Sequence, residues 1–152
     1  MFPANTAPLP SQALPAVLLV DDEEQVLRGL ARVLWRQPYR IFTTRSGSEA
    51  INVLKSRKIH VVVCDEQMPD MSGTDVLAWV AAHLPEVGRI VLTGHPSAES
   101  AITAINRAQV YRYFLKPCDP VALALAICEI LEQQRLRDSG LSISPQKSQN
   151  SK

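Results

Sequence analysis

Five short apolar runs alternate with stretches of helical periodicity along this chain, and the alternation constrains the fold more than any other feature. The runs cover residues 16–20, 40–44, 59–64, 89–92 and 110–115. Strands that alternate with helices are typical of βαβ units and a parallel sheet. The first, third and fourth runs are almost uniformly apolar, as expected of strands that helices cover on both faces. We therefore predict an α/β fold, a three-layer sandwich of five parallel strands and five alternating helices.

The segments between the runs carry helix signals. Two serine–acid pairs have the spacing of a capping box: Ser46 with Glu49, and Ser72 with Asp75. Asp119 followed by Pro120 predicts an N-cap with proline at the first helical position. Apolar residues share one helical face in two further segments: Val26, Leu27, Leu30, Val33 and Leu34 in one, and Ala98, Ala101, Ile102 and Ile105 in the other. One helix is therefore predicted after each strand.

Length and composition indicate one globular domain. The chain has 152 residues, of which 46% are hydrophobic, so it can form one ordinary domain with a core. Prolines mark residues 1–15 as a flexible leader, and a stretch rich in Ser, Gln and Lys marks residues 137–152 as a flexible tail. We expect the folded domain to cover residues 16–136.

Charge and cysteine content argue against several classes of protein. Sixteen basic and fifteen acidic residues give a net charge of +1, which argues against nucleic-acid binding by this domain. The three cysteines form no CxxC pair and favour neither a disulfide framework nor a zinc site. The apolar run at residues 16–20 is too short for a signal peptide or a membrane span. We therefore expect a cytoplasmic protein without a membrane partner.

Polar residues follow four of the five predicted strands. Asp21 and Asp22 follow the first, Asp65 the third, Thr93 the fourth and Lys116 the fifth. In an open parallel sheet these strand ends meet in one crevice, which is where such folds bind ligands. Crowded carboxylates repel each other unless a cation compensates them, and all-oxygen ligation suits Mg²⁺. Lys116 and Thr93 can bind phosphoryl oxygens, so the site is typical of phosphoryl chemistry on a carboxylate.

The ordered set of five segments resembles the receiver domain of bacterial two-component response regulators, the chemotaxis-type receiver fold. The matching segments are VLLVDDE, TTRSGSEA, VVVCDEQMPDMSG, VLTGH and YFLKP, within residues 17–136. The resemblance implies a sheet of flavodoxin-like strand order 2-1-3-4-5. Residues 102–120 also resemble receivers attached to HD-GYP phosphodiesterases, although no such output domain is recognised in the sequence.

The resemblance implies a phosphoacceptor and a metal site. Asp65 matches the phosphoacceptor, which takes a phosphoryl group from a histidine kinase or a phosphotransfer protein. Asp21 and Asp22 match the acidic pair that holds Mg²⁺ or Mn²⁺, together with Asp65 and the main-chain carbonyl of Gln67. Such a domain is not an enzyme, but it assists its own Mg-dependent phosphorylation and dephosphorylation.

Other residues match positions that bind or report the phosphoryl group. They are Thr93, Gly94 and Lys116 for phosphoryl binding, Thr93 and Tyr113 for the switch, and the side chains of Gln67 and His95 for tuning the phosphoryl lifetime. The resemblance also implies a cis bond between Lys116 and Pro117, which would turn the lysine back toward Asp65.

The final helix carries two apolar stripes. One consists of Leu123, Ile127, Ile130 and Leu131, and the other of Val121, Leu125 and Cys128. Only one stripe can face the sheet, and the resemblance assigns the first to the core. We predict that the second stripe is an interface for a homodimer or a partner protein, with the tail folding over it as the alternative.

Two other functions stay open. A phosphate-independent binding module could keep this fold, but loss of an acidic site residue or of Lys116 would then be expected, and none is lost. An aspartyl-nucleophile phosphatase of the haloacid-dehalogenase kind ranks last, because Gln67 stands where that pattern needs a second Asp. Single residues also have structural explanations: Asp22 suits a helix start, while Thr93 and Tyr113 suit half-buried strands. The sequence identifies neither the cognate kinase nor the target.

Overall fold

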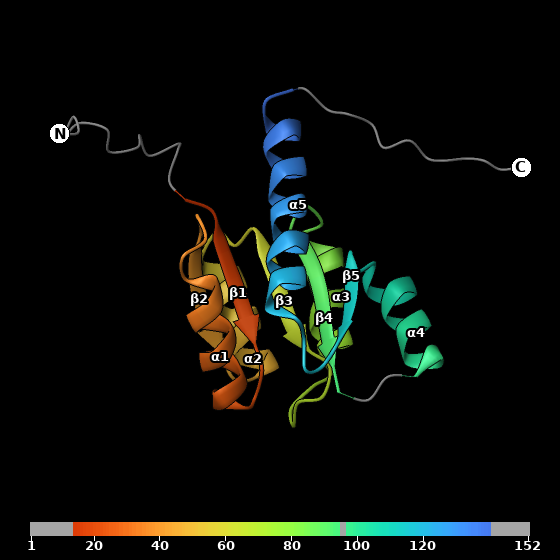
Figure 1. Cartoon of the computed structure of the whole chain (residues 1–152). Coiled ribbons are helices and arrows are strands. Elements are labelled where there is room, and N and C mark those ends of the chain that lie inside the picture. The colour runs from red at the N-terminus through yellow and green to blue at the C-terminus, as the bar shows by residue number, and fades with distance from the viewer. Residues whose placement is uncertain (1–13, 95–96, 141–152) are drawn as a thin grey trace, which may run out of the picture.

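A computed structural model describes residues 14–94 and 97–140, in which strands and helices alternate strictly (Figure 1). The strands are β1 (Ala16–Val20), β2 (Arg40–Thr44), β3 (Val61–Asp65), β4 (Gly88–Thr93) and β5 (Arg112–Leu115). The helices are α1 (Glu24–Leu34), α2 (Gly47–Ser56), α3 (Gly73–His83), α4 (Ala98–Ala108) and α5 (Pro120–Asp138). All neighbouring strands pair in parallel, in the order β2-β1-β3-β4-β5, which confirms the predicted fold.

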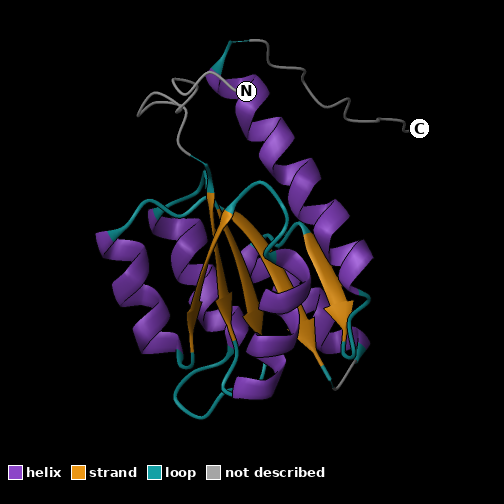
Figure 2. Ribbon diagram, turned by 60° about the vertical axis from the view of Figure 1, so that its left-hand side comes forward, coloured by secondary structure: helices purple, strands orange, loops and turns teal. Residues whose placement is uncertain are grey.

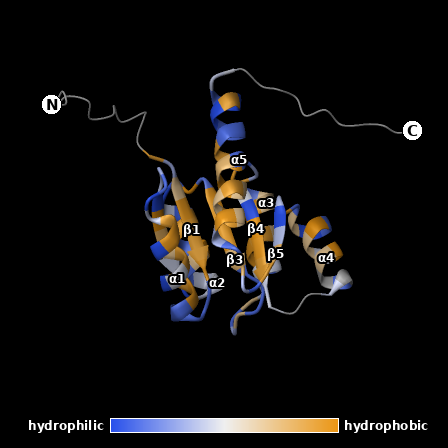
Figure 3. Ribbon diagram, in the orientation of Figure 1, coloured by the Kyte–Doolittle hydropathy of each residue, from blue (hydrophilic) through white to orange (hydrophobic). Residues whose placement is uncertain are grey.

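Helices cover both faces of the sheet (Figure 2). Alternate residues of β1 point to opposite faces, so that Leu18 belongs to one core cluster and Leu19 to the other. The first cluster adds buried side chains from α2, α3 and α4, and the second adds buried side chains from α1 and α5. Figure 3 shows the central strands in the colours of apolar residues. The two cores explain why β1, β3 and β4 read as nearly uniform apolar runs in the sequence.

Three predicted caps fix where helices begin. The Ser46 side chain accepts a hydrogen bond from the Glu49 main-chain N–H at 3.2 Å, at the start of α2. The Ser72 side chain accepts a hydrogen bond from the Asp75 main-chain N–H at 3.0 Å, at the start of α3. Asp119 accepts from the Val121 main-chain N–H at 3.0 Å, and Pro120 is the first residue of α5. These helices begin directly after the loops that follow β2, β3 and β5, so their caps also fix the geometry of those loops.

Some predicted boundaries and faces differ from the structure. β3 begins at Val61 instead of residue 59, and β5 begins at Arg112 instead of residue 110, after a positive φ of 52° at Gln109. Val33 is 45% exposed, because α1 buries only Leu27, Leu30 and Leu34. In α4 the predicted apolar face is largely exposed: Ile102 is 57% and Ile105 50% exposed, while Ala104 and Ala108 are buried.

The two stripes of α5 have different environments. Leu123, Ile127 and Ile130 are buried in the second core cluster, and Leu131 packs against it. Val121 and Leu125 are 65% and 59% exposed, and Cys128 is exposed. The stripe that was predicted to avoid the sheet therefore lies on the surface of the domain.

The ends of the domain lie partly outside the described residues. The predicted leader and tail fall largely on residues 1–13 and 141–152, of which the structure describes nothing. α5 continues to Asp138, two residues beyond the predicted end of the domain. No helix among the described residues has both the length and the apolar character needed to cross a membrane.

One of the two edge strands of the sheet is β2, which pairs only with β1 in the described sheet; the other is β5. The guanidinium groups of Arg40 and Arg57 both lie over the ring of Phe42, 5.6 and 4.6 Å from its centroid. Cations that lie over an aromatic face at this distance are attracted by the ring quadrupole. The edge strand therefore presents positive charge where an unpaired strand is open to solvent.

Candidate functional site

The topology brings four predicted residues to the carboxyl edge of the sheet. Asp21 follows β1, Asp65 and Thr93 end β3 and β4, and Lys116 follows β5. The Lys116 ammonium lies 2.9 Å from Asp21 Oδ2 and 3.1 Å from Asp65 Oδ1. A third carboxylate, that of Glu23, lies 3.5 Å from the same nitrogen. Lys116 is therefore the internal counter-ion of a buried acidic cluster.

The acidic cluster has unusual electrostatics. Asp65 is only 3% exposed, and burial raises the pKa of its carboxyl to about 6, helped by the nearby charges of Asp21 and Asp22 and opposed by Lys116. Burial alone would lower the pKa of Lys116, but its contacts with Asp21 and Asp65 raise it above its ordinary value. The lysine thus stays charged, and the Asp65 carboxylate is ionised at neutral pH at the expense of stability.

The donor set fits a hard divalent cation. One carboxylate oxygen each from Asp21, Asp22 and Asp65 lies within 4.8 Å of the other two. Three oxygen donors at this separation match the ligands that Mg²⁺ prefers, and Mg²⁺ retains water in its remaining positions. Gln67 lines a cavity of about 550 Å³ together with Asp22 and Thr93, next to these carboxylates. The main-chain carbonyl of Gln67 as a further ligand stays a prediction.

The remaining predicted residues surround this cluster, with one exception. Thr93 is buried, and Gly94 is exposed, with Lys116 Cδ 4.0 Å from the place of an added Cβ. Tyr113 is half-buried and packs against the first core cluster, and burial raises the pKa of its hydroxyl. The Lys116–Pro117 peptide bond is cis. His95 lies outside the described residues.

The loop after Asp65 is fixed by contacts that the sequence did not indicate. Glu66 accepts hydrogen bonds from the main-chain N–H and the hydroxyl of Thr74, at 2.9 and 2.7 Å. A side chain at Gly73 would overlap the main-chain carbonyl of Asp65, so that α3 begins directly against the phosphoacceptor candidate. Only a pattern of a glycine and a hydroxyl residue at the start of a helix could have pointed to this contact.

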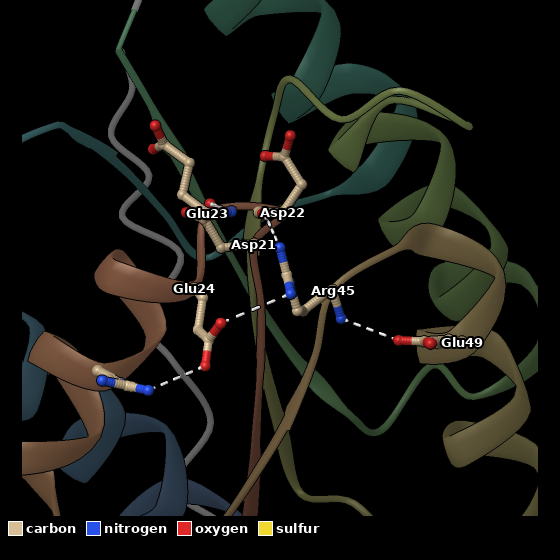
Figure 4. Close-up of polar contacts among 7 residues, drawn as sticks. Asp21, Asp22, Glu23, Glu24, Arg45 and Glu49 are labelled. Atoms are coloured by element: carbon tan, nitrogen blue, oxygen red, sulfur yellow. Dashed lines mark hydrogen bonds and ion pairs between the residues drawn. The ribbon is translucent and has the colours of Figure 1, made fainter.

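Arg45 is a second residue that sequence reasoning missed. Figure 4 shows it between the loops that follow β1 and β2, where its guanidinium contacts the main-chain carbonyl of Asp22 and the carboxylate of Glu24. Glu23, the third residue of the acidic run, was also left without a role, although it lies beside Lys116. The run of four acids at residues 21–24 could have suggested Glu23, whereas no sequence signal identifies Arg45.

Comparisons with known proteins identify the family of this chain. The family model of the response regulator receiver domain matches residues 17–128. The hydrogenase transcriptional regulatory protein HoxA of Cupriavidus necator is 36% identical over 121 residues, which cover 80% of this chain and 25% of that protein. The chain thus spans about a quarter of the length of this curated relative.

Two solved structures illustrate the similarity. The signal receiver domain of an HD domain-containing protein from Pseudomonas fluorescens Pf-5 is 36% identical, with a TM-score of 0.77, over 80% of this chain and 98% of that one. The beryllofluoride-activated receiver domain dimer of NtrC4 is 31% identical, with a TM-score of 0.73, over 78% of this chain and 98% of that one. The family model covers most of the described domain, and the chain belongs to the response regulator receiver domains of two-component signalling.

Proposed function

We propose that Asp65 accepts a phosphoryl group from a phosphohistidine of a histidine kinase or a phosphotransfer protein. The observation that carries the proposal is the Lys116 ammonium, which lies within 3.1 Å of both Asp65 and Asp21 in a pocket of three converging carboxylates. A structural ion pair would need one carboxylate. Three carboxylates at the mouth of a parallel sheet match a site for a metal and a phosphoryl group.

The proposed transfer uses the residues that meet at this site. One Asp65 carboxylate oxygen attacks phosphorus in line with the bond to the histidine nitrogen; that bond breaks as the acyl phosphate forms, and the imidazole keeps the electron pair. Lys116 is positioned to neutralise a phosphoryl oxygen, and the Thr93 hydroxyl can donate to another. Mg²⁺ or Mn²⁺, held by Asp21, Asp22 and Asp65, would neutralise charge on the phosphoryl oxygens. Hydrolysis of the acyl phosphate by water resets the domain.

A small phosphodonor tests this function without a cognate kinase. Purified protein is incubated with acetyl phosphate and Mg²⁺, and the intact mass is measured; we expect the mass to rise by one phosphoryl group. Asp65→Asn should show no rise, and Asp22→Ala should need more Mg²⁺ for the same yield. An unmodified wild-type chain under these conditions would favour the phosphate-independent binding module instead. If the Asp65→Asn variant still gains a phosphoryl group, a residue other than Asp65 is the acceptor.

Phosphorylation is proposed to act through the exposed apolar stripe of α5, which consists of Val121, Leu125 and Cys128. Leu115, at the end of β5, is also 50% exposed, and Lys116 follows it directly. The stripe therefore lies close along the chain to a residue that would bind the phosphoryl group. The solved NtrC4 receiver is a dimer in its beryllofluoride-activated form. We propose a homodimer, an output domain or a partner protein as the occupant.

Sedimentation of the phosphorylated protein tests the stripe. Leu125→Glu should abolish any phosphorylation-dependent increase in mass or partner binding while leaving the phosphorylation yield unchanged. Val33→Glu on α1 is a control on another helix, because Val33 is also an exposed apolar residue, at 45%. Equal behaviour of the two variants would exclude the stripe as the output surface.

The three free cysteines of the described part fit a reducing compartment such as the cytoplasm, where we place the protein.

A further inference from the structure

The loop that carries the acidic pair is held from outside by Arg45 (Figure 4). Arg45 follows β2 directly, and β2 pairs with β1, so the two loops lie next to each other. Arg45 Nη2 donates a hydrogen bond to the main-chain carbonyl of Asp22 at 3.1 Å, and Nη1 lies 3.7 Å from Glu24 Oε1. The main-chain N–H of Arg45 donates to Glu49 Oε1 at 3.0 Å. Arg45 is therefore anchored to α2 and contacts both Asp22 and the start of α1.

The two acidic residues of this loop depend on different supports. Asp21 is buried; its main-chain N–H donates to the Thr44 carbonyl at 3.2 Å, and its Oδ1 accepts from the Glu23 main-chain N–H at 2.9 Å. The Asp22 carboxylate accepts no hydrogen bond from any part of the chain that the structure describes, and in Figure 4 it points away from Arg45. The direction of this carboxylate is set by its main chain, and Arg45 holds that main chain.

We propose that Arg45 is a positioning residue for the metal site, which raises the affinity for Mg²⁺ by fixing the Asp22 main chain. The inference rests on the proposed function, since it assumes that Asp22 is a metal ligand. A guanidinium group suits the role because its planar fork can contact a carbonyl and a carboxylate at the same time. An ammonium group on a flexible stem offers a point charge and no such fork.

The positive charge of Arg45 should lower the affinity for Mg²⁺, whereas its positioning of Asp22 should raise it. The direction of the affinity change on removing Arg45 therefore tests the proposal. A cation near three carboxylates repels Mg²⁺, so a purely electrostatic role predicts tighter Mg²⁺ binding when Arg45 is removed. The Arg45 side chain is 58% exposed, and charges in contact with solvent are screened at physiological salt. We therefore expect positioning to outweigh repulsion, and removal of Arg45 to weaken Mg²⁺ binding.

Calorimetric titration of the unphosphorylated protein with Mg²⁺ at 0.15 M salt measures this directly. Arg45→Ala should weaken binding by about three- to ten-fold, the range expected for loss of one hydrogen bond that orders a ligand. Arg45→Lys should bind Mg²⁺ almost as weakly as Arg45→Ala, because lysine keeps the charge but lacks the planar fork of the guanidinium group. Arg28→Ala is the matched control: Arg28 also contacts Glu24, at 3.2 Å, but it has no contact with Asp22, so Mg²⁺ affinity should stay within about two-fold.

The outcomes separate this inference from the proposed function. Tighter or unchanged binding by Arg45→Ala, or full wild-type affinity in Arg45→Lys, would overturn the positioning role. If the wild type itself does not bind Mg²⁺, or if Asp22→Ala binds as well as the wild type, the metal site of the proposed function fails. Thermal unfolding in EDTA should give the same midpoint for the wild type and Arg45→Ala, which shows that the affinity change is not a loss of folding.

Discussion

The two ends of the parallel sheet differ in how their polar side chains are paired. At the amino end, Arg89 donates to the carbonyls of Ala108, Pro85 and Val87, and His60 Nδ1 accepts from the Ala16 main-chain N–H at 3.1 Å. At the carboxyl end, buried Asp21 and Asp65 share one lysine, and the pKa of Asp65 is raised to about 6. Arg89 and His60 at the amino end have complementary partners, whereas like charges meet at the carboxyl end.

This difference indicates where the domain exchanges stability for chemistry. Buried polar groups with complete partners hold the strands in register and stabilise the fold. Buried carboxylates that face each other destabilise the metal-free fold, and a cation or a phosphoryl group relieves the repulsion or changes it. Substitutions at the amino end should therefore lower the free energy of unfolding without affecting phosphorylation. Some substitutions at the carboxyl end should abolish phosphorylation and stabilise the protein.

The largest effect is expected at Gly73, where the carboxyl end has no room. Gly73→Ala places a Cβ against the Asp65 carbonyl, which cannot move without displacing the phosphoacceptor candidate. We expect the free energy of unfolding to fall by about 3 kcal/mol and the phosphorylation yield to fall with it. Gly29→Ala in α1 is the control, because no atom lies within 4 Å of the added Cβ, and it should be neutral or stabilising. Urea unfolding and intact mass measure both effects, and equal stability of the two variants would refute the clash.

Arg89 tests the amino end. Arg89→Met removes a charged donor that contacts three carbonyls, and we expect the free energy of unfolding to fall by about 2 to 3 kcal/mol. The phosphorylation yield should not change, because Arg89 lies at the opposite end of β4 from Thr93. Urea unfolding gives the first quantity and intact mass the second. A variant with wild-type stability would show that these hydrogen bonds are no better than those to water.

A substitution at Asp65 tests whether the charged carboxylates at the carboxyl end destabilise the metal-free fold. Its pKa is raised in the folded protein, so the folded state binds this proton more tightly than the unfolded state, and the free energy of unfolding falls as pH rises from about 4 to about 6. Asp65→Asn removes this loss and should stabilise the metal-free protein at pH 7 by about 2 to 3 kcal/mol, the free energy that corresponds to this shift in the pKa of Asp65. At pH 4 the gain should nearly disappear. Urea unfolding in EDTA at the two pH values checks it, and a destabilised variant at pH 7 would contradict the repulsion.

His60 should show the smallest effect, with the opposite dependence on pH. Burial, together with the charges of Lys58 and Arg40, lowers the pKa of this histidine, while Asp138 opposes the shift. The unfolded state therefore binds the proton more tightly, and stability is lost as pH falls below the ordinary histidine value of about 6.5. His60→Asn keeps an acceptor for Ala16 without a titrating group, so its stability should change by about 1 kcal/mol less than that of the wild type between pH 7 and 5. If the free energy of unfolding depends on pH in the same way for the two proteins, titration of His60 does not contribute to stability.

Local patterns predicted those parts of the molecule that local physics decides. The caps at Ser46, Ser72 and Asp119 were predictable because each depends on residues two or three positions apart. The convergence of Asp21, Asp65 and Lys116 followed from their places at the ends of parallel strands, and the strand order followed from the family resemblance. Periodicity predicted which residues share a face but not how much of that face is covered. Val33 and Ile105 are therefore exposed, although they continue apolar patterns.

The contacts that sequence reasoning missed join loop residues that lie more than one helical turn apart in the sequence. Arg45 reaches the Asp22 carbonyl 23 positions away, and Glu66 reaches Thr74 across the turn after β3. Such contacts depend on how far adjacent loops extend beyond the sheet, and no periodicity or propensity encodes this distance. The acidic run could have suggested Glu23, but the role of Arg45 could be seen only when the loops after β1 and β2 were placed together.

The two guanidinium groups over Phe42 have a consequence for how copies of the domain meet. An unpaired strand edge can recruit a strand from another molecule and so begin aggregation, and positive charge along that edge opposes it. Two copies that approached through β2 would bring Arg40 and Arg57 of each chain against the same residues of the other. Mutual repulsion at this edge disfavours association through β2 and directs reversible contacts between copies to other surfaces, so that association can depend on a signal instead of on concentration alone.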